Sequence, residues 1–167
     1  MTIIDESFKK NPKSYIVQSL LAIVAVTAIL AVVEVLTHAA IVAALGASTF
    51  IVFAMPHSIT ARPRRLIGGH VVGLAVGSLC YLVFFTGSLG RLVTGWPLVT
   101  WVIYALTVGL AIFLMAVTNT EHPPAASTAL GIVVHEFSYE VILFVLMCAV
   151  CLALVRRLLR RYLRDLF

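Results

Sequence analysis

The stretch EHPPAAST, Glu121–Thr128, places a glutamate, a histidine, two prolines and two hydroxyl side chains between two strongly apolar runs. A residue before proline is pushed toward extended backbone, and proline suits the first turn of a helix, where its missing N–H costs little. We therefore predict that His122 ends an extended segment and that a short helix begins at Pro123. Polar atoms gather at that helix start.

The composition around this stretch belongs to a membrane protein. Hydrophobic residues make up 62% of the 167-residue chain, charged residues only 11%, and the mean hydropathy is +1.09. Soluble domains carry about a quarter charged residues. We expect a cytoplasmic segment over 1–14, one transmembrane domain over 15–160 and a basic tail over 161–167. Nucleic-acid binding is disfavoured despite the net charge of +5, because the basic residues flank apolar runs.

Apolar run lengths predict an all-α membrane bundle. A spanning helix needs about 20 apolar residues. Four runs are that long, and two are shorter. We therefore predict a compact bundle of four long spanning helices plus two short or broken ones. The long runs are Tyr15–Leu36, Leu66–Phe85, Leu98–Thr118 and Tyr139–Leu159, and the short ones are His38–Met55 and Pro123–Phe137.

The basic residues bear on whether the short runs cross the membrane. Cytoplasmic flanks are enriched in Lys and Arg. If both short runs cross, eleven of the 12 Lys and Arg residues lie on one side and only Arg91 on the other; if both re-enter, the division is nine to three. Six crossings with both termini cytoplasmic, in a bacterial-type plasma membrane, are therefore favoured. The re-entrant arrangement stays open as an alternative.

The two short runs share a sequence echo, GASTF at 46–50 and AASTA at 125–129. Each short run is the middle one of three apolar segments, so the halves 15–86 and 98–160 suggest a three-plus-three inverted repeat. Short or interrupted segments at matching places in two inverted halves indicate the midplane site of a transporter. Six short crossings also make a thin bundle, which favours a homo-oligomer.

The predicted helix start suits a small anion. A helix N-terminus carries about half a positive charge and unpaired N–H donors, and a histidine adds a neutral donor or a full charge. The alternative is a purely structural turn whose hydroxyls bond their own helix carbonyls. The candidate binding residues are His122, the Ala125 and Ala126 N–H groups, Ser127, Thr128 and, from the partner run, Ser48 and Thr49.

A second polar patch, 56–70, adds two candidate residues. Arg64 after Pro63 would neutralise an anion at the cytoplasmic mouth, whereas Arg62 and Arg65 are interpreted as positive-inside anchors. His70 falls about one turn inside a helix, where an ionisable residue is a functional candidate. The glycine positions spaced by four predict a close helix contact, either internal or at a dimer seam; they are Gly68, Gly69, Gly73 and Gly77.

The sequence motifs give little support for an enzyme active site or a metal site. HEFSY, beginning at His135, lacks the second histidine of a zinc-protease helix, and no nucleophile elbow, phosphate-binding loop or dinucleotide fingerprint is present. A looser His/Glu metal site near the outer face stays an alternative. We therefore expect no catalytic residues, no resident metal and no cofactor. The cysteines are interpreted as small apolar packing residues.

Two stretches together resemble the HPP integral membrane family. They are GASTFIVFAMPHSITARPRRLIGGH, Gly46–His70, and EHPPAASTAL, Glu121–Leu130. The chain departs from the family pattern at Arg65 and at Ala126. The resemblance implies a compact domain usually described as four-spanning, and plant plastid and cyanobacterial members have been assigned nitrite transport. We therefore expect transport of a small anion, nitrite first, with or without a proton. The alternatives are a non-transporting interaction or regulatory module and a channel for another small solute.

Overall fold

The described part of the chain is helical. The computed structural model describes residues 11–14, 16–18, 20–21, 39–135 and 138–166. No strand occurs in these ranges, which confirms the all-α prediction. The elements are α3 (Ala39–Ala54), the 3₁₀ turn η1 (Ile59–Ala61), α4 (Pro63–Phe84), α5 (Gly87–Thr94), α6 (Pro97–Val117), α7 (Pro123–Val134) and α8 (Tyr139–Leu159).

Three of these helices are long and apolar enough to span a membrane. They are α4 with 22 residues and α6 and α8 with 21 each, and they confirm three of the four predicted long runs. The remaining long run, 15–36, falls largely outside the described residues. The two short runs form α3, with 16 residues, and α7, with 12. At 1.5 Å per residue they reach only about 24 and 18 Å, against a hydrocarbon core of about 30 Å.

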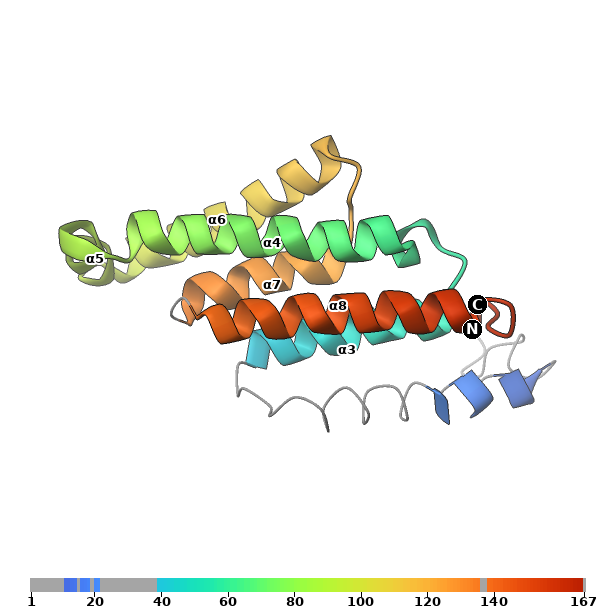
Figure 1. Cartoon of the computed structure of the whole chain (residues 1–167). Coiled ribbons are helices and arrows are strands. Elements are labelled where there is room, and N and C mark those ends of the chain that lie inside the picture. Colours follow the sequence, from blue (N-terminus) through green and yellow to red (C-terminus); the bar gives the residue numbers. More distant parts are fainter. Residues whose placement is uncertain (1–10, 15, 19, 22–38, 136–137, 167) are drawn as a thin grey trace, which may run out of the picture.

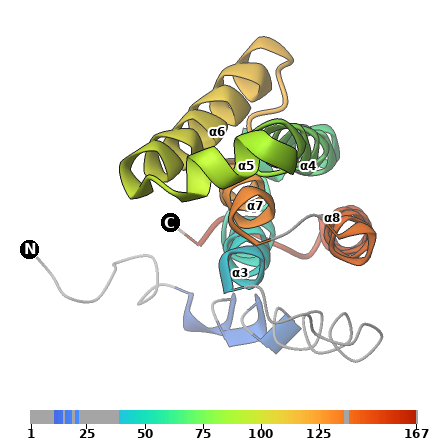
Figure 2. The ribbon, with the colours of Figure 1, turned by 90° about the vertical axis from the view of Figure 1, so that its left-hand side faces the viewer.

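Helix α7 lies at the centre of the bundle (Figures 1 and 2). It packs against α3, α4 and α6, while α8 packs against α3 and α4. Helices α3 and α7 lie side by side and run in opposite directions, as an inverted repeat requires. The inverted repeat itself stays a prediction, because residues 22–38, which belong to its first half, are outside the described ranges.

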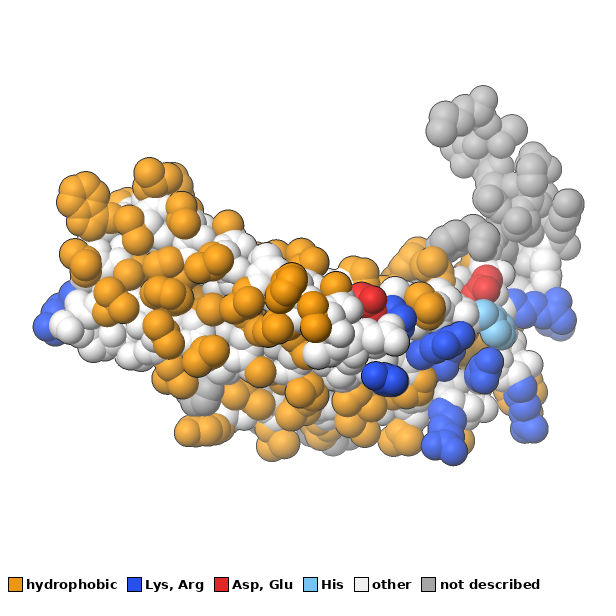
Figure 3. All heavy atoms as spheres, turned by 90° about the horizontal axis from the view of Figure 1, so that it is seen from above, with side chains coloured by type: hydrophobic (Ala, Val, Ile, Leu, Met, Phe, Trp, Pro, Cys, Tyr) orange, Lys and Arg blue, Asp and Glu red, His pale blue; other side chains and the backbone are white. Residues whose placement is uncertain are grey.

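The course of the chain bears on the re-entrant alternative. Helix α4 begins and α8 ends at the same end of the bundle, which we call the basic end; α6 runs toward that end, and α8 begins on the opposite side (Figure 1). The short extended lead turns the chain back into the bundle, and α7 then runs away from the basic end to the start of α8. The re-entrant alternative therefore stays open. Arginine side chains gather at the basic end, and an isolated basic group marks the far end (Figure 3).

Helices α4 and α7 approach closely because α4 presents glycines. A Cβ atom at Gly77 would lie 2.7 Å from the carbonyl oxygen of Ala129, and one at Gly69 would lie 2.6 Å from Cβ of His122. Between them, Gly73 faces the backbone of Ala125. The predicted close helix contact is therefore present, and it lies inside the chain.

The basic end is closed by polar contacts to the C-terminal residues. The backbone N–H of Leu166 donates to the Ala54 carbonyl at 2.9 Å, and the buried Arg156 guanidinium donates to the Pro56 carbonyl through Nε and Nη2 at 2.9 and 2.6 Å. Gln18 accepts from the Arg164 N–H at 2.9 Å. The predicted basic tail thus folds back over the end of α3.

Helix α5 was not expected from the sequence. It is eight residues long and lies across the ends of α4 and α6, away from the basic end (Figures 1 and 2). Buried Gly90 and Val93 face the protein, while Leu92 and Arg91 are exposed. An element this short gives no run of spanning length, so hydropathy could not indicate it.

The glycine contact predicts that Gly73→Ala disrupts the bundle. Its Cβ would meet the backbone of Ala125, and overpacking of this kind typically costs about 1–3 kcal/mol. Gly109→Ala in α6 is the matched control, because a Cβ there meets nothing within 4 Å and alanine favours a helix by about 0.5–1 kcal/mol. Thermal unfolding in detergent, followed by circular dichroism, measures both. Equal midpoints for the two variants would contradict the close contact.

Candidate functional site

The site is built around the turn that precedes α7. Helix α6 ends with Asn119 in the left-handed region, at φ 57°, and the Thr120 N–H donates back to the Met115 carbonyl at 2.9 Å. This turn ends α6 and directs the chain back into the bundle. His122 is extended, with φ −136° and ψ 98°, and the helix begins at Pro123. Both features of the opening stretch are therefore confirmed.

Two imidazoles and two hydroxyls meet beside this turn, and we call Ser48, His70, His122 and Thr128 the histidine cluster. Ser48 Oγ lies 2.9 Å from His122 Nε2 and 3.1 Å from His70 Nε2. His70 Nδ1 lies 3.0 Å from Thr128 Oγ1, and His122 Nδ1 lies 3.0 Å from the Thr60 carbonyl oxygen. The cluster joins α3, α4, α7 and the turn η1 in one continuous chain of hydrogen bonds.

The cluster is sealed from the surface. His122, Ser48 and Thr128 are 0% exposed and His70 is 4% exposed. The two imidazole centroids lie 5.2 Å apart, with the rings tilted by 59°. Polar groups are costly to bury unless they are hydrogen-bonded. Each imidazole here has partners at both ring nitrogens, so the structure satisfies the buried histidines. Four of the nine predicted site residues are thereby brought together.

The two remaining hydroxyl candidates stand apart from the cluster. Thr49 is buried, but its Oγ1 donates to the Leu45 carbonyl of its own helix at 2.9 Å. The structural alternative from the sequence therefore holds for Thr49. Ser127 lies on the exposed face of α7. Neither side chain contributes to the histidine cluster.

The other three candidates also lie outside the cluster. Ala125 is fully buried, and its N–H donates to the His122 carbonyl at 2.9 Å. Ala126 is half-buried beside it, and Arg64 is exposed at the start of α4. The start of α7 therefore directs the Ala125 N–H to its own backbone in this conformation.

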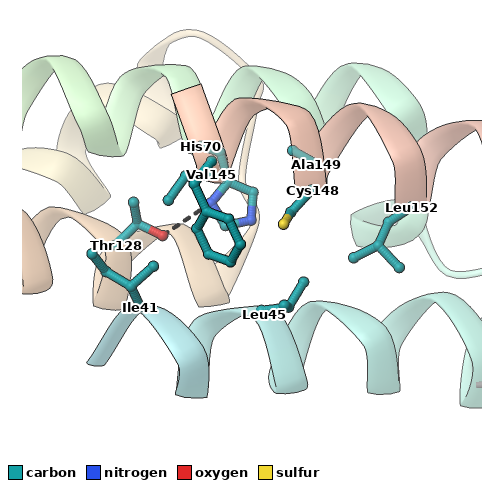
Figure 4. A pocket seen from close by; sticks show the side chains of 9 residues that line it. Ile41, Leu45, His70, Thr128, Val145, Cys148, Ala149 and Leu152 are labelled. Carbon is teal, nitrogen blue, oxygen red and sulfur yellow. Dashed lines mark hydrogen bonds between the residues drawn. The ribbon is translucent and has the colours of Figure 1, made fainter. Parts of the chain in front are cut away.

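A small cavity borders the cluster on the side of α8 (Figure 4). The free volume for the centre of a water molecule is about 10 Å³, the lower limit for one bound water. His70 and Thr128 supply its polar wall. The other lining residues are Ile41, Leu45, Phe144, Val145, Cys148, Ala149 and Leu152. The histidine cluster thus faces a nearly closed apolar space.

An ion pair links the start of α4 to the residue that precedes His122. Arg65 Nη1 donates to the Glu121 carboxylate, and Arg65 Nη2 donates to the Asn119 side-chain carbonyl. The Arg65 side chain is only 14% exposed and that of Glu121 is 42% exposed. The sequence interpretation treated Arg65 as an anchor, so this partner of the Glu121–Thr128 stretch was missed. The sequence did hold a signal for this pair, because Arg65 and Glu121 carry opposite charges and lie in the two stretches that resemble the HPP family.

The comparisons with known proteins decide the family. The profile of the HPP transmembrane region matches residues 8–165, nearly the whole chain. The chain belongs to the HPP family. Two proteins from Dictyostelium discoideum, described only as transmembrane proteins, are each 37% identical, over 92 and 86 residues. These matches cover 54% and 51% of this chain but 28% and 24% of the relatives, so the chain spans about a quarter of their length. No solved structure matches significantly.

This HPP chain shows no metal centre in its described residues. No group of three or more His, Cys, Asp or Glu side chains lies close enough there to hold an ion. The looser His/Glu site expected near the outer face would use His38, His135, Glu136 and Glu140, and of these His38 and Glu136 lie outside the described ranges. The alternative of a looser His/Glu site therefore gains no support from the described part.

The Arg65–Glu121 pair of this HPP protein predicts a measurable coupling. Partly exposed ion pairs contribute about 0.2–1 kcal/mol. Arg65→Ala and Glu121→Ala should each destabilise the protein, and the double variant should lose less than the two single losses combined. The thermal unfolding midpoints of all four proteins in detergent give the coupling free energy. Strictly additive losses would show that the pair does not contribute.

Proposed function

We propose that this HPP protein transports a small inorganic anion together with a proton, and that nitrite is the first substrate to test. The observation that carries the proposal is the fully buried histidine cluster inside an apolar bundle, beside a cavity between α4, α7, α3 and α8. Ionisable side chains within a membrane domain are expensive and mark solute or proton pathways.

The charge of the cluster supports a role for the proton. Its side chains are imidazoles and hydroxyls, so a positive charge arises there only when an imidazole is protonated. Arg65 is already paired with Glu121, and Arg64 is exposed. An anion in the cavity would therefore be attracted only with an accompanying proton. Entry of the neutral acid, or of the anion with a proton, satisfies this condition.

The cavity size favours a carrier over a permanently open channel. The space beside Thr128 is at the lower limit for one water, and nitrite is larger. Helix α8 supplies most of the opposite wall through residues such as Phe144 and Cys148. We infer that α8 moves relative to α3 and α7 during transport. Access from each side would then alternate around the histidine cluster.

The remaining parts of the proposal follow from the charge pattern and the family resemblance. Nitrite is small, flat and anionic, and the HPP resemblance implies it. The basic end would face the cytoplasm by the positive-inside rule. Twenty-eight large hydrophobic side chains are exposed on the described part of one chain, which suits contact with lipid and with further copies in a homo-oligomer.

The first prediction of the proposal concerns His122. Proteoliposomes containing the protein should take up nitrite faster as external pH falls from about 8 to about 5.5, because protonation then becomes easier. His122→Ala should lose that pH dependence and slow uptake by about tenfold. His57→Ala is the matched control, because the side chain of His57 is 43% exposed and lies outside the cluster. Anion-specific fluorescence quenching follows uptake.

Two results would count against this proposal. Unchanged uptake and pH dependence in His122→Ala would remove the assigned role of that histidine. If the unaltered protein moves none of nitrite, nitrate, formate or chloride, the non-transporting interaction module is favoured instead.

The second prediction uses the native Cys148 on the cavity wall. In a Cys80→Ser, Cys151→Ser background, Cys148 should react with a small cationic methanethiosulfonate when the cavity opens to water, and nitrite should slow the reaction. Cys80 alone is the control, because it is buried in a different apolar cluster, beside Val76 and Met115. Inhibition of uptake and mass spectrometry measure the modification. Equal labelling of both cysteines, unaffected by nitrite, would contradict access through the cavity.

A further inference from the structure

The hydrogen bonds of the histidine cluster have a defined direction. A carbonyl oxygen only accepts, so His122 Nδ1 must donate its proton to Thr60. In the neutral imidazole, Nε2 of His122 is then an acceptor, and Ser48 Oγ must donate to it. The Ser48 hydroxyl has a single proton, so it accepts from His70 Nε2. His70 Nδ1 in turn accepts from the Thr128 hydroxyl.

This assignment leaves the Thr128 oxygen facing the cavity as an acceptor. Its one proton is engaged by His70, and a hydroxyl oxygen has two acceptor positions. Thr128 is part of the cavity wall (Figure 4). With both imidazoles neutral, the cavity, once widened by the α8 movement inferred above, therefore suits a molecule that donates a hydrogen bond, such as a neutral acid. It does not suit an anion.

A proton on His122 reverses every hydrogen bond of the chain except the one to the Thr60 carbonyl. With both ring nitrogens protonated, His122 donates to Thr60 and to Ser48. Ser48 must then donate to His70 Nε2, and His70 carries its proton on Nδ1 and donates it to Thr128. The Thr128 O–H is released toward the cavity. The same chain of five groups, from the Thr60 carbonyl to the Thr128 hydroxyl, then presents a hydrogen-bond donor to the cavity, as an anion requires.

We propose that Thr128, His70, Ser48 and His122 form a reversible proton relay that stores the proton of a bound acid on His122 and turns the cavity into an anion site. The acid gives its proton to Thr128 Oγ1, and the Thr128 proton passes to His70 Nδ1. The proton on His70 Nε2 passes to Ser48, and the Ser48 proton passes to His122 Nε2. The acid is left as its anion, accepting from Thr128; no bond between heavy atoms changes.

The surroundings favour His122 as the storage site. Its Nδ1–H is already bonded to the Thr60 carbonyl, and the carboxylate of Glu121 belongs to the adjacent residue. On α4, Arg65 is engaged by that carboxylate, and on α8 the thiol of Cys148 lies across the cavity. On α6, the buried Thr107 hydroxyl donates within its own helix. Among the described residues, no carboxylate lines the cavity itself.

Ser48 is the reversing element of this relay. A hydroxyl can donate to either imidazole and accept from the other, which alanine cannot do. The anion-binding step rests on the proposed transport function, whereas the directed hydrogen bonds rest only on the geometry. A spectroscopic test can therefore separate the two.

Nuclear magnetic resonance of ¹⁵N-histidine in the full-length protein tests the relay directly. Pyrrole-type and bare imidazole nitrogens differ in ¹⁵N chemical shift, and single histidine variants assign the signals. At alkaline pH, His122 should carry its proton on Nδ1 and His70 on Nε2. On acidification, His122 should become doubly protonated while His70 moves its proton to Nδ1 at the same midpoint. A neutral His122 protonated on Nε2, or a His70 that keeps its tautomer, would overturn the relay.

Ser48 variants provide the matched comparison. Ser48→Ala should uncouple the tautomer of His70 from protonation of His122, and Ser48→Thr, which keeps a hydroxyl, should retain the coupling. Proton-coupled nitrite uptake should slow about tenfold in Ser48→Ala, the effect of losing one buried hydrogen bond to a charged group, and much less in Ser48→Thr. Coupling that survives in Ser48→Ala would overturn the role of Ser48. The expected tautomers in a protein that moves no anion would support the relay and contradict the proposed transport.

Discussion

The start of α7 inside the bundle is the constraint on which the rest of the structure depends. Backbone that is not helical at membrane depth has polar groups that only protein can satisfy. The chain meets this need by closing α6 at Asn119 and by bringing the extended residues to η1 and α4. The glycine face of α4 makes the approach close enough. A side chain at Gly69 would displace His122 itself, so helix packing and the polar network are one arrangement.

The hydrogen-bond partners of the buried hydroxyls distinguish a functional site from ordinary helix packing. A buried Ser or Thr in a membrane helix can bond a carbonyl of its own helix, as Thr49 and Thr107 do at 2.9 and 2.8 Å. Ser48 and Thr128 instead bind imidazoles from other helices. Interhelical hydrogen bonds in membranes contribute only about 0.6 kcal/mol on average. Stability alone is thus a weak reason to bury two histidines with them.

The sequence predicted the local backbone of this site better than it predicted which side chains would form it. Proline geometry was enough to predict the extended His122 and the helix start at Pro123. Adjacent residues on a helix point about 100° apart, so GASTF and AASTA could each direct only one hydroxyl at the imidazoles. Which one depends on tertiary packing. Thr49 is also buried but bonds a carbonyl of its own helix. The Arg65–Glu121 pair joins positions 56 residues apart, a contact that no periodicity encodes. Composition and run length predicted the all-α class and three long helices, whereas the fourth run lies largely outside the described residues.

A closed network raises the question of how it could bind a ligand without losing its own hydrogen bonds. Breaking one buried bond leaves an unsatisfied group, at a cost of about 1–3 kcal/mol. A chain of hydroxyls and imidazoles avoids this cost, because every hydrogen bond beyond the Thr60 carbonyl can reverse its direction while each contact is kept. The hydrogen-bond donor offered to an anion is then the Thr128 O–H on the cavity side. No existing hydrogen bond has to break to supply it. Two histidines with one serine between them carry this reversal from the fixed Thr60 carbonyl, at one end of the chain, to the Thr128 hydroxyl at the cavity.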